Sequence, residues 1–109
     1  MDRILIVDDD SSMRYSLNRM LEAPGLEVLP ARNGEEALAL FVRERPNLVV
    51  MDIKMPGESG LAVLRRMKEQ DPKSLVILMT AFGTTETAIE AMKYGAFDYI
   101  LKPFDIPQM

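Results

Sequence analysis

Acidic and hydroxyl side chains stand at the ends of apolar runs in this chain of 109 residues. Asp8 and Asp9 follow the first apolar run, and Asp52 follows the third. Thr80 follows the fourth run and Lys102 follows the fifth. If the runs are parallel strands, their carboxyl ends meet at one edge of a sheet, where α/β proteins bind ligands. We therefore expect carboxylates, a hydroxyl and an ammonium group to lie together there.

A site of this composition suits the transfer of a phosphoryl group to a carboxylate. Carboxylates repel each other at short range, and a divalent cation removes the conflict because its charge dominates such a site. Mg²⁺ prefers oxygen ligands and typically uses only one or two carboxylates. Asp8 and Asp9 would hold the ion, which leaves Asp52 as the nucleophile that forms an aspartyl phosphate. Thr80 and Lys102 would bind the phosphoryl oxygens.

Each of these residues also has an ordinary structural interpretation. An Asp before a helix is commonly an N-cap, and we expect Asp10 either to have that role or to be solvated, with Ser11 as another plausible N-cap. An isolated Thr or Lys at a strand end is more often structural than functional. The convergence of four strand ends favours the functional interpretation.

Five short apolar runs predict strands that are covered on both faces. Most runs are continuous rather than alternating, which is typical of buried parallel strands. The second run is the most polar, so we place it near an edge of the sheet. The predicted strands are residues 4–7, 26–29, 48–51, 75–79 and 97–101.

Apolar residues with helical spacing lie between the strands. Asn33 with Glu36 three residues later resembles a capping box, and Gly95 marks the end of the fourth helix. The strict alternation of strand and helix predicts a parallel sheet with helices on both faces. The predicted apolar helix faces are Met13, Leu17, Met20 and Leu21; Ala37, Leu38 and Phe41; Leu61, Leu64 and Met67; and Ala88, Ile89 and Met92.

Composition narrows the kinds of site and the classes of protein. The chain has no Cys and no His, so a metal site must use oxygen ligands, which favours Mg²⁺, Ca²⁺ or Mn²⁺. The net charge is -4 and the basic residues are scattered, so we expect no direct nucleic-acid binding. We find no signal segment and no apolar run near the roughly 18 residues of a membrane span, and we expect a cytoplasmic protein without membrane association.

The chain resembles the receiver domains of two-component response regulators over essentially its whole length, and we treat 1–109 as one such domain. The resemblance implies a doubly wound five-stranded parallel sheet of the flavodoxin-like order 2-1-3-4-5. A fifth helix normally begins where this chain stops, so we expect that helix to be truncated. The matching motifs are residues 4–10 (ILIVDDD), 52–57 (DIKMPG) with Gly60, 79–81 (MTA) and 102–104 (KPF).

The resemblance implies that Asp52 is the phosphoacceptor and also belongs to the metal site. Asp9 would bind Mg²⁺ directly and Asp8 largely through water. The backbone carbonyl of Lys54 would be a further metal ligand. Thr80 and Lys102 would again bind the phosphoryl oxygens.

The resemblance also implies a switch, in which Tyr99 turns inward when Thr80 moves toward the phosphate. An alternative for Tyr99 is a partly buried strand residue whose hydroxyl is hydrated. Lys54 and Phe82 each lie two residues past a site residue, and we hypothesise that they tune how long the phosphoryl group survives.

Residues 80–93 and 95–99 look like the receivers of nitrogen-regulator-type transcription activators. This likeness implies a sensor histidine kinase as phosphodonor and, beyond this chain, an output region with an ATPase and a DNA-binding domain. It also allows a homodimer. Phosphorylation would alter the surface formed by the fourth helix and the fifth strand.

Two other functions are open to a chain of this kind. A magnesium-dependent phosphohydrolase with an aspartyl nucleophile usually needs a further acid–base residue, but the second position after Asp52 is Lys54. A receiver-like module that no longer accepts phosphate would lack part of the site, whereas this chain has every residue of it.

Overall fold

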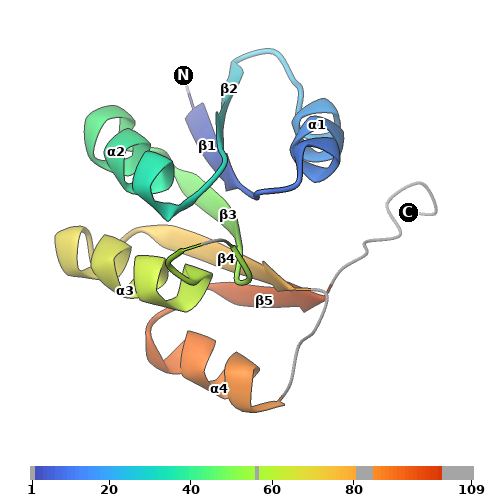
Figure 1. Cartoon of the computed structure of the whole chain (residues 1–109). Helices are drawn as coiled ribbons and strands as arrows, with labels where there is room; N and C mark the ends of the chain where they lie inside the picture. Colours follow the sequence, from blue (N-terminus) through green and yellow to red (C-terminus); the bar gives the residue numbers. More distant parts are fainter. Residues whose placement is uncertain (1, 56, 81–84, 102–109) are drawn as a thin grey trace.

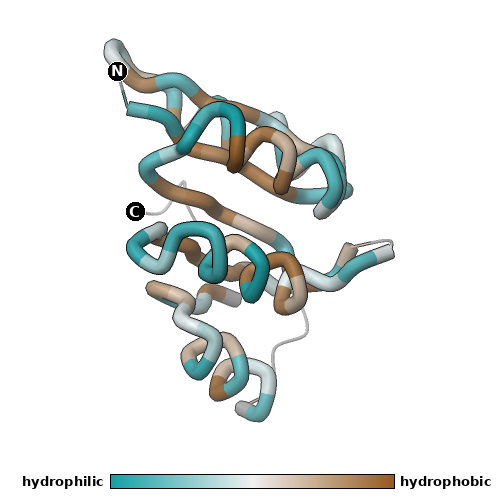
Figure 2. Tube along the Cα trace, turned by 90° about the vertical axis from the view of Figure 1, so that its left-hand side faces the viewer, coloured by the Kyte–Doolittle hydropathy of each residue, from teal (hydrophilic) through white to brown (hydrophobic). Residues whose placement is uncertain are grey.

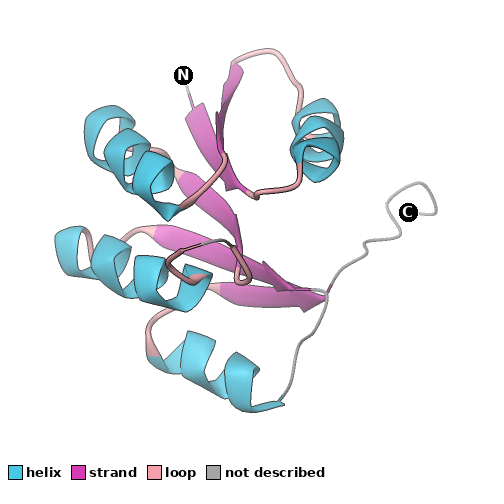
Figure 3. Cartoon of the chain, viewed as in Figure 1, coloured by secondary structure: helices cyan, strands magenta, loops and turns pink. Residues whose placement is uncertain are grey.

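The computed structural model describes residues 2–55, 57–80 and 85–101, in which strands and helices alternate strictly (Figure 1, Figure 3). The strands are β1 (Asp2–Val7), β2 (Leu26–Ala31), β3 (Leu48–Asp52), β4 (Leu75–Thr80) and β5 (Asp98–Leu101). The helices are α1 (Ser11–Met20), α2 (Gly34–Glu44), α3 (Gly60–Gln70) and α4 (Thr85–Lys93).

The five strands form one parallel sheet in the order β2-β1-β3-β4-β5, which confirms the predicted fold and the edge position of the second strand. Parallel neighbours need crossover connections, and here the helices supply them. The helices α2, α3 and α4 cover one face of the sheet, and α1 covers the other (Figure 1). Among the described helices, none is long and apolar enough to cross a membrane. The predicted fifth helix falls on residues outside the described ranges.

The core has two parts because successive side chains of a strand point to opposite faces. Leu5 and Met51 are buried under α2 and α3, whereas Ile6 and Val50 pack with Leu17 of α1 on the other face. In Figure 2, hydrophobic residues (brown) run along the strands, while hydrophobic and hydrophilic residues (teal) alternate along the helices. Full burial of one such aliphatic side chain contributes roughly 1.5–3 kcal/mol.

The N-caps of α1 and α2 can be compared with the residues predicted for them from the sequence. Asp10 caps α1, since its side chain accepts a hydrogen bond from the Ser12 N–H; this confirms the N-cap role expected for Asp10, and the alternative cap Ser11 was wrong. The Asn33 side chain accepts from the Glu36 N–H at 2.9 Å, which confirms the predicted cap of α2. The Glu36 carboxylate, however, accepts from the N–H of Arg32, one residue before the position that a capping box requires.

The predicted apolar face of α4 was wrong. Ile89 and Met92 are 54% and 51% exposed, whereas Ala91 of the same helix is buried in the core. Periodicity shows which residues share a helix face, but not how the helix is rotated on the sheet. Gly95 ends the helix region as predicted, with a positive φ of 96°. Phe97 directly precedes β5 and is exposed, although its N–H donates to the Val76 carbonyl of β4 at 2.7 Å.

Candidate metal-binding site at the carboxyl edge of the sheet

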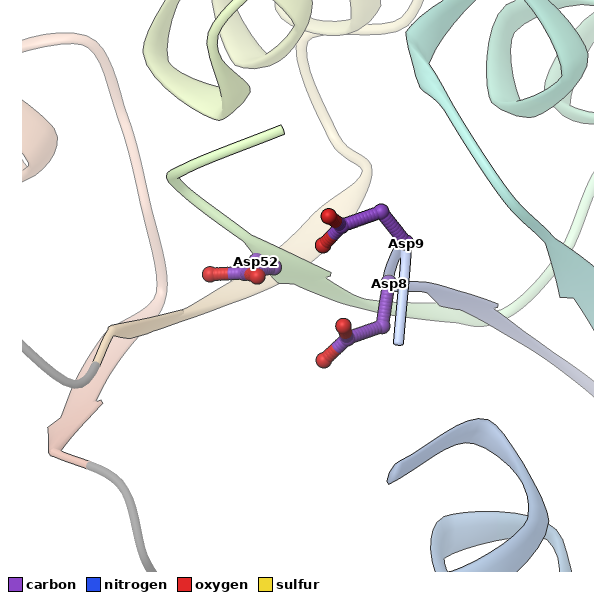
Figure 4. Close-up of side chains that lie close together, drawn as sticks. All are labelled: Asp8, Asp9 and Asp52. Atoms are coloured by element: carbon purple, nitrogen blue, oxygen red, sulfur yellow. The ribbon is translucent and has the colours of Figure 1, made fainter. Parts of the chain in front are cut away.

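Three carboxylates meet where β1 and β3 end. These strands are hydrogen-bonded neighbours with Val7 opposite Met51, so the next residues, Asp8 and Asp52, come level with each other. Carboxylate oxygens of Asp8, Asp9 and Asp52 all lie within 4.8 Å of one another. Their side chains extend to the same side of the strand ends (Figure 4). The structure therefore brings together the three carboxylates that the sequence predicts at this edge.

Two of the three carboxylates are buried, and this burial determines what the cluster can bind. Asp8 is 0% exposed and Asp52 is 7% exposed, whereas Asp9 faces solvent. Charged carboxylates lose hydration on burial and repel each other, so a cation of high charge density stabilises such an arrangement. The donors are all hard oxygen atoms, which fits an ion such as Mg²⁺.

Backbone N–H groups hold the two buried carboxylates in place. Oδ1 of Asp8 accepts a hydrogen bond from the Asp10 N–H at 2.9 Å. Oδ1 of Asp52 accepts from the Lys54 N–H at 3.3 Å. Both bonds span two residues and tie the side chain to the loop that follows it, so each loop conformation helps to set its carboxylate.

The β3–α3 loop is anchored at both ends. The Ile53 N–H donates to the Met79 carbonyl at 2.9 Å, and the Gly60 N–H donates to the Ile53 carbonyl at 2.7 Å. A Cβ atom at Gly60 would overlap the Asp52 carbonyl oxygen, so only glycine permits this close approach. Beside the loop lies an open cavity of about 440 Å³, lined by Asp9, Ile53, Lys54, Met55 and Ser59. The Lys54 side chain is exposed.

Thr80 is buried at the end of β4, one residue beyond Met79, which pairs with Asp52. This places Thr80 at the same edge as the carboxylates, as the sequence predicts. Lys102 and Phe82 lie outside the described residues, so their roles stay predictions.

Tyr99 lies in β5 opposite Leu78, and its ring packs against the core on the α3 side. Its hydroxyl is buried and has no hydrogen-bond partner within the described part of the chain. Burial raises the pKa of this phenol above its ordinary value. Tyr99 is thus a partly buried strand residue, as the alternative interpretation has it, but its hydroxyl is buried rather than exposed to solvent.

Sequence reasoning missed one residue next to the carboxylate cluster. Nη1 of Arg14, in α1, donates to the backbone carbonyl of Asp8 at 2.6 Å. The available signal was a cation in the second turn of the helix that follows the Asp pair.

Comparisons with known proteins agree with this geometry. A family model described as response regulator receiver domain matches residues 4–109. The regulatory protein AtoC of Escherichia coli (strain K12) is 44% identical over 108 residues, which are 99% of this chain and 23% of AtoC. Sporulation initiation phosphotransferase F of Bacillus subtilis (strain 168) is 41% identical over 108 residues, covering 99% of this chain and 87% of that protein.

Among solved structures, the response regulator protein TrrA from Thermotoga maritima, in complex with Mg(2+)-BeF, superposes with a TM-score of 0.87. It is 36% identical, and the match covers 99% of this chain and 92% of that one. The present chain spans less than a quarter of the length of AtoC. Fold, acidic cluster and sequence likeness lead to one assignment: the chain belongs to the receiver domain family of two-component response regulators.

Proposed function

We propose that this receiver domain is a phosphorylation-activated switch and that Asp52 accepts the phosphoryl group. The observation that carries the proposal is the position of Asp52, which ends the central strand β3 with its carboxylate oxygens within 4.8 Å of those of Asp8 and Asp9. A carboxylate oxygen of Asp52 forms the new bond to phosphorus while the bond from phosphorus to the donor breaks, and the donor leaves with that electron pair.

Asp8, Asp9 and the backbone carbonyl of Lys54 hold Mg²⁺ in this proposal. The fit rests on hard oxygen donors, two of them buried, and on the cavity that opens beside Asp9 and Lys54. When bound, the ion supplies positive charge that offsets the carboxylates and the incoming phosphoryl oxygens. Asp52 is part of the same oxygen cluster and also carries the nucleophilic oxygen.

Thr80 and Lys102 bind the remaining phosphoryl oxygens. Thr80 supports this role by its place at the end of β4, beside the strand that carries Asp52. A hydroxyl donates a hydrogen bond and an ammonium group adds charge, and both matter most as the phosphoryl group transfers. Lys54 and Phe82 tune the slow hydrolysis of the phosphorylated domain, because each stands two residues past a site residue.

Tyr99 and Thr80 transmit the change to the surface formed by α4 and β5. The buried Tyr99 hydroxyl lacks a partner among the described residues, and an unpaired buried hydroxyl costs about 1–3 kcal/mol. Because this position of the Tyr99 side chain carries such a cost, a second position of the side chain needs less free energy to become populated. A new bond between Thr80 and the phosphoryl group can then shift the population between the two arrangements.

The output of the switch is transcription control, through an ATPase and a DNA-binding domain outside this chain. Two likenesses support this proposal: residues 80–93 and 95–99 resemble the receivers of nitrogen-regulator-type activators, and the chain is 44% identical to 22% of the DNA-binding transcriptional regulator NtrC of Salmonella typhimurium. A sensor histidine kinase in the cytoplasm supplies the phosphoryl group, and two copies of the domain associate when phosphorylated.

The test is phosphoryl uptake from acetyl phosphate with MgCl₂, followed by intact-protein mass spectrometry. We expect the parent chain to gain one phosphoryl group and Asp52→Asn to gain none. Asp10→Asn is the matched control, because Asn keeps both the side-chain size and the N-cap of α1, and it should label like the parent. Labelling of Asp52→Asn at the parent rate would refute the assignment.

A further inference from the structure

Arg14 is joined to the metal-binding cluster through the backbone. Its Nη1 donates to the carbonyl oxygen of Asp8 at 2.6 Å, across six residues of sequence. The carboxylate of the same Asp8 belongs to the cluster, and Asp9 follows directly. The guanidinium group therefore holds the peptide unit from which both carboxylates extend.

The surrounding bonds show that Arg14 completes a closed loop. Oδ1 of Asp8 accepts from the Asp10 N–H, and the Asp10 side chain accepts from the Ser12 N–H. The Arg14 N–H in turn donates to the Asp10 carbonyl at 3.0 Å. The first turn of α1 and the Arg14 side chain are thus both hydrogen-bonded to the loop that carries Asp8 and Asp9.

We propose that Arg14 is a positioning residue of the metal site, which sets the loop conformation in which Asp8 and Asp9 converge on Asp52. The inference rests on the proposed function, because it concerns the same metal. Residues that orient metal ligands typically alter metal affinity by 10–100-fold when they are replaced.

The charge of Arg14 and its hydrogen bond to the Asp8 carbonyl should affect Mg²⁺ affinity in opposite directions. A guanidinium near the cluster repels a cation, so the removal of its charge alone would tighten Mg²⁺ binding. The removal of a positioning bond would weaken Mg²⁺ binding. The charge of Arg14 does affect a nearby carboxyl. The pKa of Glu36 is lowered mainly by hydrogen bonds from Arg32 and, to a smaller extent, by the charge of Arg14. The sign of the affinity change therefore separates the two effects.

Arg19 offers a matched control on the same helix. It is exposed, and its Nη1 donates to the hydroxyl of Tyr15 rather than to the backbone of the site. Arg19→Met removes the same charge and the same number of donors from α1 as Arg14→Met. A general effect of the charge or helix propensity of α1 would appear in both variants.

The experiment is isothermal titration calorimetry of the full chain with MgCl₂, for the parent, Arg14→Met, Arg14→Lys and Arg19→Met. We expect Arg14→Met to bind Mg²⁺ at least about tenfold more weakly. Arg14→Lys keeps one donor and the charge, and should recover part of the affinity. Arg19→Met should bind like the parent.

Equal or tighter Mg²⁺ binding by Arg14→Met would overturn the inference and leave the proposed metal site intact. A parent chain that binds no Mg²⁺ would overturn both. Circular dichroism without metal checks that the variants fold. If Arg14→Met does not fold, Arg14→Gln replaces it, because Gln is polar and uncharged but two atoms shorter in reach, and the same weakening is expected.

Discussion

The two ends of the parallel sheet differ in how charged side chains are arranged. At the amino end, Arg3 of β1 forms ion pairs with Glu27 at 2.8 Å and with Glu44 at 3.6 Å. It also donates to the Glu44 backbone carbonyl at 3.0 Å. At the carboxyl end, Asp8, Asp9 and Asp52 gather three like charges within 4.8 Å. The first arrangement pairs opposite charges, whereas the second gathers oxygen ligands of like charge and is suited to a bound cation.

This difference shows which end contributes to the stability of the sheet and which end contributes to function. Opposite charges at the amino end connect β1, β2 and the end of α2. Like charges at the carboxyl end repel each other, and a bound cation offsets that repulsion. Substitutions at the two ends should therefore respond differently to Mg²⁺.

The largest effect is expected for Asp8→Asn. At a free MgCl₂ concentration of 100 times the dissociation constant, a bound ligand stabilises the folded state by about 2.7 kcal/mol. Asp8→Asn should lose this gain, because the buried carboxylate contributes to the cation site. Urea unfolding with and without MgCl₂ measures it, and Glu27→Gln at the amino end should keep the gain. If Asp8→Asn gains as much stability as the parent, the comparison of the two ends fails.

Gly60→Ala should destabilise the fold by about 2 kcal/mol, with or without MgCl₂. The new methyl group would overlap the Asp52 carbonyl and lie 2.8 Å from Cα of Ile53. It should also slow phosphoryl uptake, because Asp52 has to move. Gly25→Ala is the control: its φ of 81° strains the backbone, but no atom lies within 4 Å of the added Cβ. Uptake at the parent rate by Gly60→Ala would show that the close approach does not position Asp52.

Arg3→Met should cost about 1 kcal/mol of unfolding free energy at low salt. Its ion-pair partners are partly exposed, so part of the loss should disappear in 1 M NaCl. Thermal unfolding at two salt concentrations measures this change. A loss that depends on MgCl₂ instead would mean that the two ends of the sheet are coupled.

The smallest effect concerns the pair of Arg32 and Glu36 at the start of α2. The hydrogen bond from the Arg32 side chain lowers the pKa of the Glu36 carboxyl below its ordinary value of 4.5. A carboxyl with a lowered pKa stabilises the folded state above its ordinary pKa, and this contribution is lost as the pH falls through the lowered pKa. Glu36→Gln should therefore flatten the fall in stability below about pH 4.5. Identical pH profiles for the two proteins would show that the pair adds nothing.

The carboxylate cluster could be predicted because only the strands and the residues that follow them had to be identified. Continuous apolar runs identify buried parallel strands, and the residue after each run must lie at the carboxyl edge. Asp8, Asp9 and Asp52 follow from that rule alone. Thr80 also lies at this edge, but its bond to a phosphoryl group stays a prediction.

The sequence did not predict how α4 is rotated about its axis or which residue caps α1. The spacing of Ala88, Ile89 and Met92 defines a helix face, yet Ala91 is buried in the core while Ile89 and Met92 are exposed. For the N-cap of α1 the sequence offered both Asp10 and Ser11, and the structure selects Asp10, because the turn after β1 determines where the helix begins.

The sequence by itself determined the alternation of strands and helices, the oxygen-only chemistry of the site and the edge at which the carboxylates meet. Only the tertiary structure decided that the Arg14 side chain reaches the Asp8 carbonyl and that the Tyr99 hydroxyl is buried without a partner among the described residues. Periodicity is a local property that repeats along the chain. The reach of a long side chain and the burial of a single atom depend on elements that the sequence leaves unplaced.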